Sequence, residues 1–294
     1  MTESIRKIYL ASSRGFCAGV IRAVKLVENT LAEYGPPVFV HHDIVHNEYV
    51  VNGFREKGVI FVESLTEISK GRPVIFSAHG VSPEVEKKAE TLGLYSIDAT
   101  CPLVKKIHKK AVSLRKEGYT VILIGHKKHP EIIGTLGHLG GEGIVVESIM
   151  DVDKLNISKD IKKITYLTQT TLSPADVEDI ITKLQERFHS LTHPVSTNIC
   201  YATLDRQDAV RALTEKCSTI FVIGSSASSN SRRLKEVAER IGARTFLINT
   251  WSDITEDMLG TTGNIGITAG ASAPETLVSE LILFLTDKGF KIAD

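Results

Sequence analysis

Apolar residues along the chain form short, strand-sized runs that alternate with longer amphipathic stretches. The amphipathic stretches repeat their apolar residues at three- and four-residue spacing, which is typical of helices. Strands alternating with helices predict βαβ units and parallel sheets, and therefore an α/β fold. The expected strands cover residues 7–12, 38–45, 74–80, 95–100, 120–126, 164–170, 219–225, 244–249 and 264–270. The expected helices cover residues 20–35, 83–93, 103–118, 173–188, 206–216, 231–242 and 274–289, and many end in glycine.

The number of strands bears on how they are arranged. A single open sheet of nine or more strands would be strained, so we expect several smaller sheets. Several strands run directly into small or polar residues, as in FSAHG, LIGHKKHPE, LTQTT, VIGSSASSNS and ITAGAS. Ligands of open α/β sheets bind beyond the carboxyl ends of the strands, so these segments are the first indication of a site.

Composition narrows the class of protein. Lys plus Arg and Asp plus Glu both total 35, which gives a formal net charge of zero and disfavours a nucleic-acid partner. The first residues do not have the pattern of a signal peptide, and no apolar run reaches the ~20 residues of a membrane span. We therefore expect a cytoplasmic protein without a membrane partner, whose four cysteines stay reduced.

Three of the cysteines occupy loop or strand-end positions. Cys17 lies in RGFCAGV, Cys101 follows YSIDAT, and Cys200 lies in NICYAT. They could converge on a metal or cluster, but the spacing contains no C-x-x-C, and an isolated cysteine is often a small buried hydrophobe. Cys217 lies where a helix meets a strand, so we expect it in the core.

Three histidines and one glutamate stand in turns. His46, His79 and His129 each suit a structural hydrogen bond or a ligand contact equally well. Pro130 fits the first position of a helix, which would place Glu131 in its first turn. Glu131 could serve the helix terminus or act as a proton donor, and both roles remain open.

Two turns have the composition of anion sites. Residues 225–231 read SSASSNS before a helix, with more hydroxyl and amide groups than a helix cap needs. Ser272 precedes Pro274 in a similar turn. These turns suggest a phosphate or diphosphate, whereas the absence of Walker and G-x-G-x-x-G motifs disfavours a nucleotide.

Together, these segments resemble the 4-hydroxy-3-methylbut-2-enyl diphosphate reductase (LytB/IspH) family over about residues 8–285. The resemblance rests on ten ordered motifs: RGFCAGV, VHNEYVV, FSAHGVS, DATCPLV, IGHKKHPE, TQTTLS, NICYAT, RQDAVRAL, GSSASSNSRRL and TAGASAPE.

The resemblance implies one 4Fe-4S cluster per chain, held by Cys17, Cys101 and Cys200, with one iron open to substrate. It implies Glu131 as the proton donor and Thr170 as the residue that orients the substrate hydroxyl. We expect the pKa of Glu131 to be raised by the neighbouring diphosphate and cluster. The diphosphate-binding residues that the resemblance implies are His46, His79, His129, Ser228, Ser229, Asn230 and Ser272.

The family fold implies three small α/β domains with mainly parallel sheets, in a pseudo-threefold arrangement around the cluster. The expected domains are residues 18–100, 101–197 and 198–294, the last completed by an N-terminal strand within 1–17. The implied reaction is reductive dehydroxylation to isopentenyl and dimethylallyl diphosphate, the last step of the methylerythritol phosphate pathway. Ferredoxin or flavodoxin would supply the electrons.

Two other classes of function remain possible from the residues. In a cysteine-dependent hydrolase or transferase, Cys17 or Cys101 would be the nucleophile and His79 the base. Such a protein would be active without metal. A non-catalytic iron–sulfur sensor would bind a cluster but would not turn over substrate.

Overall fold

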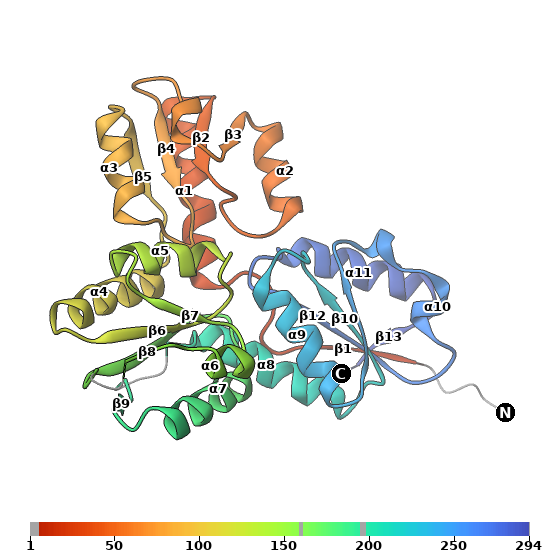
Figure 1. Ribbon diagram of the computed structural model, residues 1–294. Coiled ribbons are helices and arrows are strands. Elements are labelled where there is room, and N and C mark those ends of the chain that lie inside the picture. The colour runs from red at the N-terminus through yellow and green to blue at the C-terminus, as the bar shows by residue number, and fades with distance from the viewer. Residues whose placement is uncertain (1–5, 159–160, 195–197, 294) are drawn as a thin grey trace. The chain divides into compact units, whose positions relative to one another are not determined.

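The structure is a computed structural model that describes residues 6–158, 161–194 and 198–293 (Figure 1). The contacts divide the chain into two compact units. The terminal unit consists of Met1–Ile21, Val45–Phe54 and Tyr201–Asp294, and the central unit of Arg22–Ile44 and Arg55–Cys200.

The strands form three sheets, and every pairing between described strands is parallel. The terminal unit holds a five-stranded sheet in the order β11-β10-β12-β1-β13, and the central unit holds sheets β3-β2-β4-β5 and β7-β6-β8-β9. The predicted α/β class with several small parallel sheets is therefore confirmed. The strands are β1 (Lys7–Leu10), β2 (Val38–His41), β3 (Val59–Val62), β4 (Pro73–Phe76), β5 (Tyr95–Asp98), β6 (Thr120–Ile124), β7 (Ile144–Val146), β8 (Ile164–Thr168), β9 (Leu191–Thr192), β10 (Thr219–Ile223), β11 (Arg244–Ile248), β12 (Ile265–Ala269) and β13 (Lys291–Ile292).

Helices follow most of the strands, as the alternation predicts (Figure 1). Within the described residues, no helix combines the length and hydrophobicity needed to cross a membrane. The helices are α1 (Ala18–Tyr34), α2 (Glu48–Glu56), α3 (Pro83–Thr91), α4 (Pro102–Lys116), α5 (Pro130–His138), α6 (Ile149–Asp153), α7 (Pro174–Arg187), α8 (Tyr201–Thr214), α9 (Ser229–Arg240), α10 (Glu256–Leu259) and α11 (Glu275–Asp287), with short 3-10 turns at Leu65–Glu67 and Trp251–Asp253.

The five-stranded sheet is covered on both faces, because alternate side chains of a strand point to opposite sides. Phe221 and Ile223 of β10 pack in one apolar cluster with α11. Ile220 and Val222 of the same strand pack in a second cluster with α8 and α9, which also contains Cys217. The prediction that Cys217 is a core residue is confirmed.

In the central unit, apolar clusters join each sheet to its helices. Ala89 of α3 packs with β2, β3 and β4 residues, and Ile107 of α4 and Ile132 of α5 pack with β6 and β8 residues. Each of these helices follows a strand. Its packing against a sheet therefore fixes the two ends of the loop that joins strand and helix.

The structure differs from the sequence-based elements at sheet edges, at helix starts and in helices α2, α6 and α10, which the expected helices do not cover. All nine expected strands are present, but β3, β7, β9 and β13 were missed, and all four are edge strands. Helix α8 begins at Tyr201 rather than at 206, and α9 begins at Ser229 rather than at 231. The earlier start of α9 follows from its cap, because the Ser228 hydroxyl accepts the N–H of Ser231 at 3.3 Å.

Each predicted domain contains one of the three sheets, and β1 from the N-terminal segment pairs with β12 and β13. The domain boundaries and the pseudo-threefold placement stay predictions. The boundary at residue 197 lies outside the described residues, as do residues 1–5 and 294.

Candidate functional site

In the terminal unit, the predicted site residues follow three neighbouring strands. Strands β10, β12 and β1 are adjacent and parallel, so their carboxyl ends share one edge of the sheet. Ser228–Asn230 follow β10, Ser272 follows β12, and Cys17 follows β1. This edge is the position where parallel sheets bind ligands.

The loop that carries Cys17 runs alongside the chain that leaves β12. The N–H of Gly15 donates to the carbonyl of Ala269, and the N–H of Cys17 donates to that of Ala271, both at 3.1 Å. Gly15 has φ 70°, a left-handed conformation that favours glycine. Cys17 is thus placed next to the backbone of the residue that precedes Ser272.

Ser272 also connects this edge to His46. The Ser272 hydroxyl donates to the backbone carbonyl of His46 at 3.0 Å, although the two residues are far apart in sequence. The Ser272 side chain is buried and the His46 side chain is partly exposed. The loop 270–272 therefore contacts two other predicted site residues of this unit. It bonds to Cys17 through the Ala271 carbonyl and to His46 through the Ser272 hydroxyl.

Asn230 is a buried amide with unused hydrogen-bonding capacity. Asn230 is 4% exposed, and neither its side-chain nitrogen nor its side-chain oxygen has a hydrogen-bond partner among the described residues. Gly270 leaves room for this turn, since a Cβ there would lie 2.0 Å from the Ser231 hydroxyl oxygen and 3.5 Å from the Asn230 nitrogen. A buried polar group without a partner is costly, so this amide indicates a binding position for a polar ligand.

The Ser228 side chain combines two functions. It caps α9 by accepting the N–H of Ser231, and a hydroxyl that accepts one bond can still donate its proton. Ser229 and Asn230 lie in the first turn of this helix, whose N-terminal end favours anions. The turn can therefore present hydroxyl and amide donors to a phosphate group.

In the central unit, Glu131 and Thr170 form a closely bonded pair. The Thr170 hydroxyl donates to one carboxyl oxygen of Glu131 and its backbone N–H donates to the other, both at 2.8 Å. Both residues are buried. Burial raises the pKa of Glu131 to about 7, and the two bonds from Thr170 act in the opposite direction. The raised pKa therefore comes from desolvation by the protein itself, and the structure needs no neighbouring anion to account for it.

His129 is the cap of helix α5. Its Nδ1 accepts the backbone N–H of Glu131 at 3.2 Å, with Pro130 in the first helical position as expected. An accepting Nδ1 carries no proton, so the neutral ring is protonated at Nε2 and can donate there. The ring of His79 meets the His129 ring edge-on at 5.6 Å between centroids.

The two remaining predicted cysteines border the same group of residues. The N–H of Cys200 donates to the carbonyl of Thr170, and the N–H of Cys101 donates to that of Ala78, the residue before His79, both at 2.9 Å. The central unit thus links Cys200, Thr170, Glu131 and His129 through direct contacts, and His79 extends the group toward Cys101.

The predicted cysteines differ from Cys217 in their surroundings. Cys17, Cys101 and Cys200 are partly exposed thiols, and each immediately precedes the first residue of a helix: α1, α4 and α8. Burial raises the pKa of the Cys217 thiol to about 11. Within the described part of the chain, no trio of His, Cys, Asp or Glu side chains is grouped around a single-metal position.

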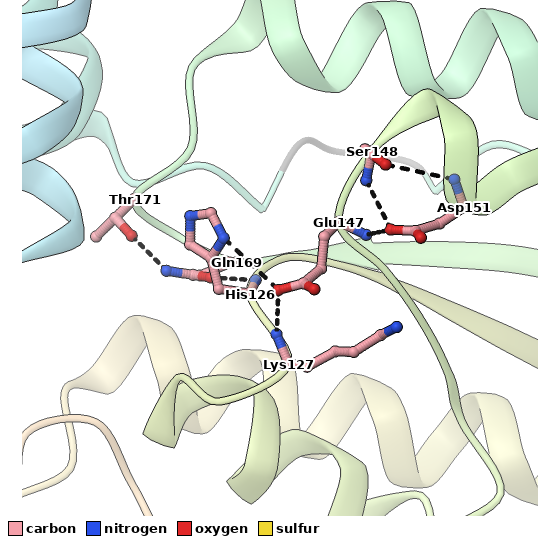
Figure 2. Close-up of polar contacts among 7 residues, drawn as sticks. All are labelled: His126, Lys127, Glu147, Ser148, Asp151, Gln169 and Thr171. Carbon is pink, nitrogen blue, oxygen red and sulfur yellow. Dashed lines mark hydrogen bonds and ion pairs between the residues drawn. The ribbon is translucent and has the colours of Figure 1, made fainter.

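Sequence reasoning missed Gln169 as an individual residue. It is fully buried, its side-chain oxygen accepts the N–H of His126 at 3.0 Å, and its nitrogen donates to the Thr171 hydroxyl at 2.8 Å (Figure 2). Gln169 therefore ties the loop after β6, which leads to His129, to the loop after β8, which carries Thr170. In the sequence, the only indication of a role for Gln169 was its position directly after the end of β8.

The Lys127 end of the same loop is held by a second contact. The N–H of Lys127 donates to the carboxylate of Glu147 at 2.8 Å, and Glu147 and Ser148 both donate their N–H groups to Asp151 (Figure 2). Glu147 therefore holds the loop that leads to His129, and Asp151 holds the turn that carries Glu147.

Sequence reasoning also missed Arg206, in the RQDAVRAL motif. The side chain is buried and donates to the carbonyl of Gly15 at 2.6 Å. Arginine is rarely fully buried unless its donors are satisfied, and its hydrophilic character hides it in a pattern search.

The site residues suggest two kinds of chemistry. The terminal unit offers buried hydroxyl and amide donors suited to a phosphate anion. The central unit offers a carboxylic acid whose pKa near 7 suits proton transfer. Partly exposed thiols occur in both units.

Comparison with known proteins assigns the family. A sequence model of the LytB protein family matches residues 8–286. A 4-hydroxy-3-methylbut-2-enyl diphosphate reductase from Ruthia magnifica is 49% identical over 283 residues, which cover 96% of this chain and 92% of that protein. A reductase of the same name from Escherichia coli is 48% identical over 286 residues, covering 96% and 90%.

Solved structures agree with the sequence comparison. The E-1-hydroxy-2-methyl-but-2-enyl-4-diphosphate reductase from Plasmodium falciparum superposes with a TM-score of 0.95 at 39% identity, covering 99% of this chain and 92% of that one. The expected resemblance is confirmed over nearly the whole length, and the chain belongs to the LytB protein family.

Proposed function

We propose that the protein reduces 4-hydroxy-3-methylbut-2-enyl diphosphate to isopentenyl and dimethylallyl diphosphate, the last step of the methylerythritol phosphate pathway. The observation that carries the proposal is the identity of 48–49% over 96% of the chain to reductases of this name. A further solved relative at 33% identity and a TM-score of 0.70 is described as the terminal enzyme of the non-mevalonate pathway.

The reaction breaks one C–O bond. The allylic alcohol, two electrons and two protons give the dehydroxylated diphosphate and one water. One proton goes to the departing hydroxyl oxygen, because water leaves more readily than hydroxide. The second goes to either end of the allylic system, which accounts for two products.

Glu131 is the proposed source of the proton for the departing hydroxyl. With its pKa raised to about 7, its carboxyl group carries a proton in a substantial fraction of molecules at neutral pH. Both of its oxygens are held by Thr170, so its orientation is fixed before substrate arrives. Thr170 is the proposed contact for the substrate hydroxyl.

The diphosphate would be bound mainly by neutral donors. This assignment is supported by the Asn230 amide, which has no partner among the described residues, by the Ser228 hydroxyl and by the Nε2–H of His129. Because the anion anchors the substrate, it keeps the C–O bond oriented while remaining attached itself. The full proposed set is His46, His79, His129, Ser228, Ser229, Asn230 and Ser272.

Cys17, Cys101 and Cys200 are the proposed ligands of one 4Fe-4S cluster. Thiolate sulfur is the ligand that iron–sulfur clusters prefer, and these three thiols are partly exposed at helix starts, where the helix dipole favours negative charge. When bound, the cluster supplies electrons and Lewis acidity. Ferredoxin or flavodoxin would deliver the electrons in a reducing compartment such as the cytoplasm.

Anaerobic purification followed by iron, sulfide and turnover assays tests the proposal. We expect about four iron atoms per chain and conversion of the substrate with a low-potential chemical reductant. Activity of a colourless, metal-free protein would instead support the cysteine-dependent hydrolase or transferase. A loaded protein that leaves the substrate unchanged would support the sensor.

A matched series of cysteine variants tests the ligand assignment. Cys17→Ala, Cys101→Ala and Cys200→Ala should each lose most of the bound iron, because each removes a ligand. Cys217→Ala should keep it, since that thiol packs in the core. Equal iron loss in Cys217→Ala would contradict the assignment.

A further inference from the structure

Arg206 places a buried guanidinium group beside the Cys17 loop. Arg206 is 4% exposed, and its guanidinium donates to the carbonyl of Ala202 at 2.7 Å and to that of Gly15 at 2.6 Å. Burying a charge is costly, and the two bonds from the terminal nitrogens offset part of that cost, so they constrain both partners.

The bond to Gly15 fixes the loop at its turn. The N–H of Gly15 is bonded to Ala269 on the sheet side, and its carbonyl is bonded to Arg206. The left-handed backbone at Gly15 sets the directions of its N–H and its carbonyl, so Arg14 and Phe16 on either side are constrained. Cys17 lies two residues further on, with its own N–H bonded to Ala271.

A second arginine holds the start of the same loop. Arg14 donates to the carbonyl of Ala11 at 2.7 Å and pairs with Glu275 at 2.6 Å, at the start of α11. Both Arg14 and Glu275 are partly solvent-exposed, with side-chain exposures of 24% and 53%. Exposed ion pairs contribute little, whereas the bond from Arg206 to Gly15 is buried.

The other bond of Arg206 reaches the start of its own helix. Ala202 is the second residue of α8, the helix that begins directly after Cys200. One guanidinium therefore joins the loop of one proposed cluster ligand to the first turn of the helix that follows another.

We propose that Arg206 is a positioning residue for cluster binding, which holds the Cys17 loop in its ligating conformation and adds a fixed positive charge near the cluster. The inference rests on the proposed function, because it takes Cys17 to be a ligand. Thiolate-ligated clusters carry negative charge, and reduction adds more. A nearby guanidinium therefore stabilises the reduced form and raises the reduction potential.

The test compares Arg206→Met and Arg206→Lys with Arg211→Met. Arg211 lies on the same helix but is exposed and pairs with Asp208, so it is a matched control. In the apo-protein, mass spectrometry follows alkylation of Cys17 by iodoacetamide, with Cys101 as the internal reference. Arg206→Met should speed alkylation of Cys17 several-fold and leave Cys101 unchanged.

In the loaded protein, chelator-driven iron release and the midpoint potential are measured. Outer contacts of metal ligands typically change metal affinity by 10–100-fold, so Arg206→Met should release iron roughly 10-fold faster. Its midpoint potential should fall, whereas Arg206→Lys should retain the potential and restore the release rate only in part. Arg211→Met should match the wild type in every measurement.

Several results would overturn the inference. One is an unchanged alkylation rate for Cys17 in Arg206→Met. Another is equal acceleration at Cys17 and Cys101, which would show general loosening of the chain. A third is an unchanged midpoint potential. A wild-type protein that takes up no iron would instead refute the proposed function, and the alkylation rates would still decide whether Arg206 orders the loop.

Discussion

The candidate residues of the terminal unit and those of the central unit, the two halves of the proposed site, each include a buried polar group, and the two groups differ in how they are hydrogen-bonded. In the terminal unit, the Asn230 amide is buried without a partner in the part of the chain that the structure describes. In the central unit, both oxygens of Glu131 are bonded by Thr170, and Nδ1 of His129 is bonded by the Glu131 N–H.

This difference matches the chemistry proposed for each half. A site that binds an anion needs donors that the protein leaves unused, at a cost in stability that the ligand recovers. A proton donor needs a fixed orientation and a dry environment, which internal bonds and burial provide. Substitutions in the two halves should therefore separate loss of binding from loss of stability.

The largest expected effect is on turnover in Glu131→Gln. The amide preserves the shape of the side chain and can accept a bond from Thr170, but it cannot deliver a proton. Turnover should fall at least roughly 100-fold while substrate binding persists, as measured by steady-state kinetics and calorimetry. Glu142→Gln, at an exposed position, is the control. Near-normal turnover would move the donor role to Thr170, a histidine or the diphosphate.

The next effect is the pH dependence of stability. The pKa of Glu131 rises from an ordinary 4.5 to about 7 on folding, so the folded state resists ionisation. The contribution of Glu131 to the free energy of unfolding is fully present below its unfolded pKa of 4.5 and is lost as pH rises through its folded pKa of about 7. Between pH 5 and pH 8, the wild type should lose roughly 2 kcal/mol more unfolding free energy than Glu131→Gln. Urea titrations at several pH values measure this, and parallel curves for the two proteins would contradict it.

A smaller effect should distinguish the two halves directly. Thr170→Val removes an internal bond and should lower the free energy of unfolding by about 1–2 kcal/mol. Asn230→Ala removes an amide that has no partner among the described residues, so it should cost less than about 0.5 kcal/mol. Asn230→Ala should instead weaken inorganic diphosphate binding about tenfold, equivalent to about 1.4 kcal/mol. If Asn230→Ala destabilises the protein as much as Thr170→Val does, the comparison fails.

The smallest effect concerns the two functions of Ser228. Ser228→Ala should cost about 1 kcal/mol of stability through loss of the helix cap, whereas Ser228→Gly should cost only a few tenths. Both variants lose the donating hydroxyl, so both should weaken diphosphate binding to a similar degree. Thermal melts and calorimetry test the pair. Binding losses that follow the stability losses instead would assign Ser228 to capping alone.

The sequence predicts the buried strands well and the edges poorly. Most of the expected strands carry apolar runs because neighbours cover them, as in the fully buried β10, whereas the edge strand β5 is exposed at Tyr95 and Ser96. The missed strands β9 and β13 contain two residues each, and β3 is buried at its ends but exposed at Ile60. Two or three residues, as in β7, β9 and β13, are too few to show a period, so pairing with an existing sheet defines these strands. Strand β3 is as long as the expected strand β2, so its length does not explain why it was missed.

The same limit applies to the site. Cys17, Glu131 and Ser228 could be selected because strand ends are recognisable in sequence, whereas their hydrogen-bond partners could not. The bond from Thr170 to Glu131 joins residues 39 positions apart, and that from Arg206 to Gly15 joins residues 191 apart. Arg206 and Gln207 are also both buried in α8, where a hydrophobic pattern would place them on the surface.

The position of β1 has a consequence for the synthesis of the protein. Strand β1 lies between β12 and β13, so the first strand made pairs only with strands from the last part of the chain. The backbone partners of the Cys17 loop, Ala269 and Ala271, are also translated late. During translation this loop therefore stays without these two backbone partners until residues 269 and 271 are available. We therefore expect Cys17 to be ordered only near the end of translation, and insertion of the proposed cluster at this position to be a late event.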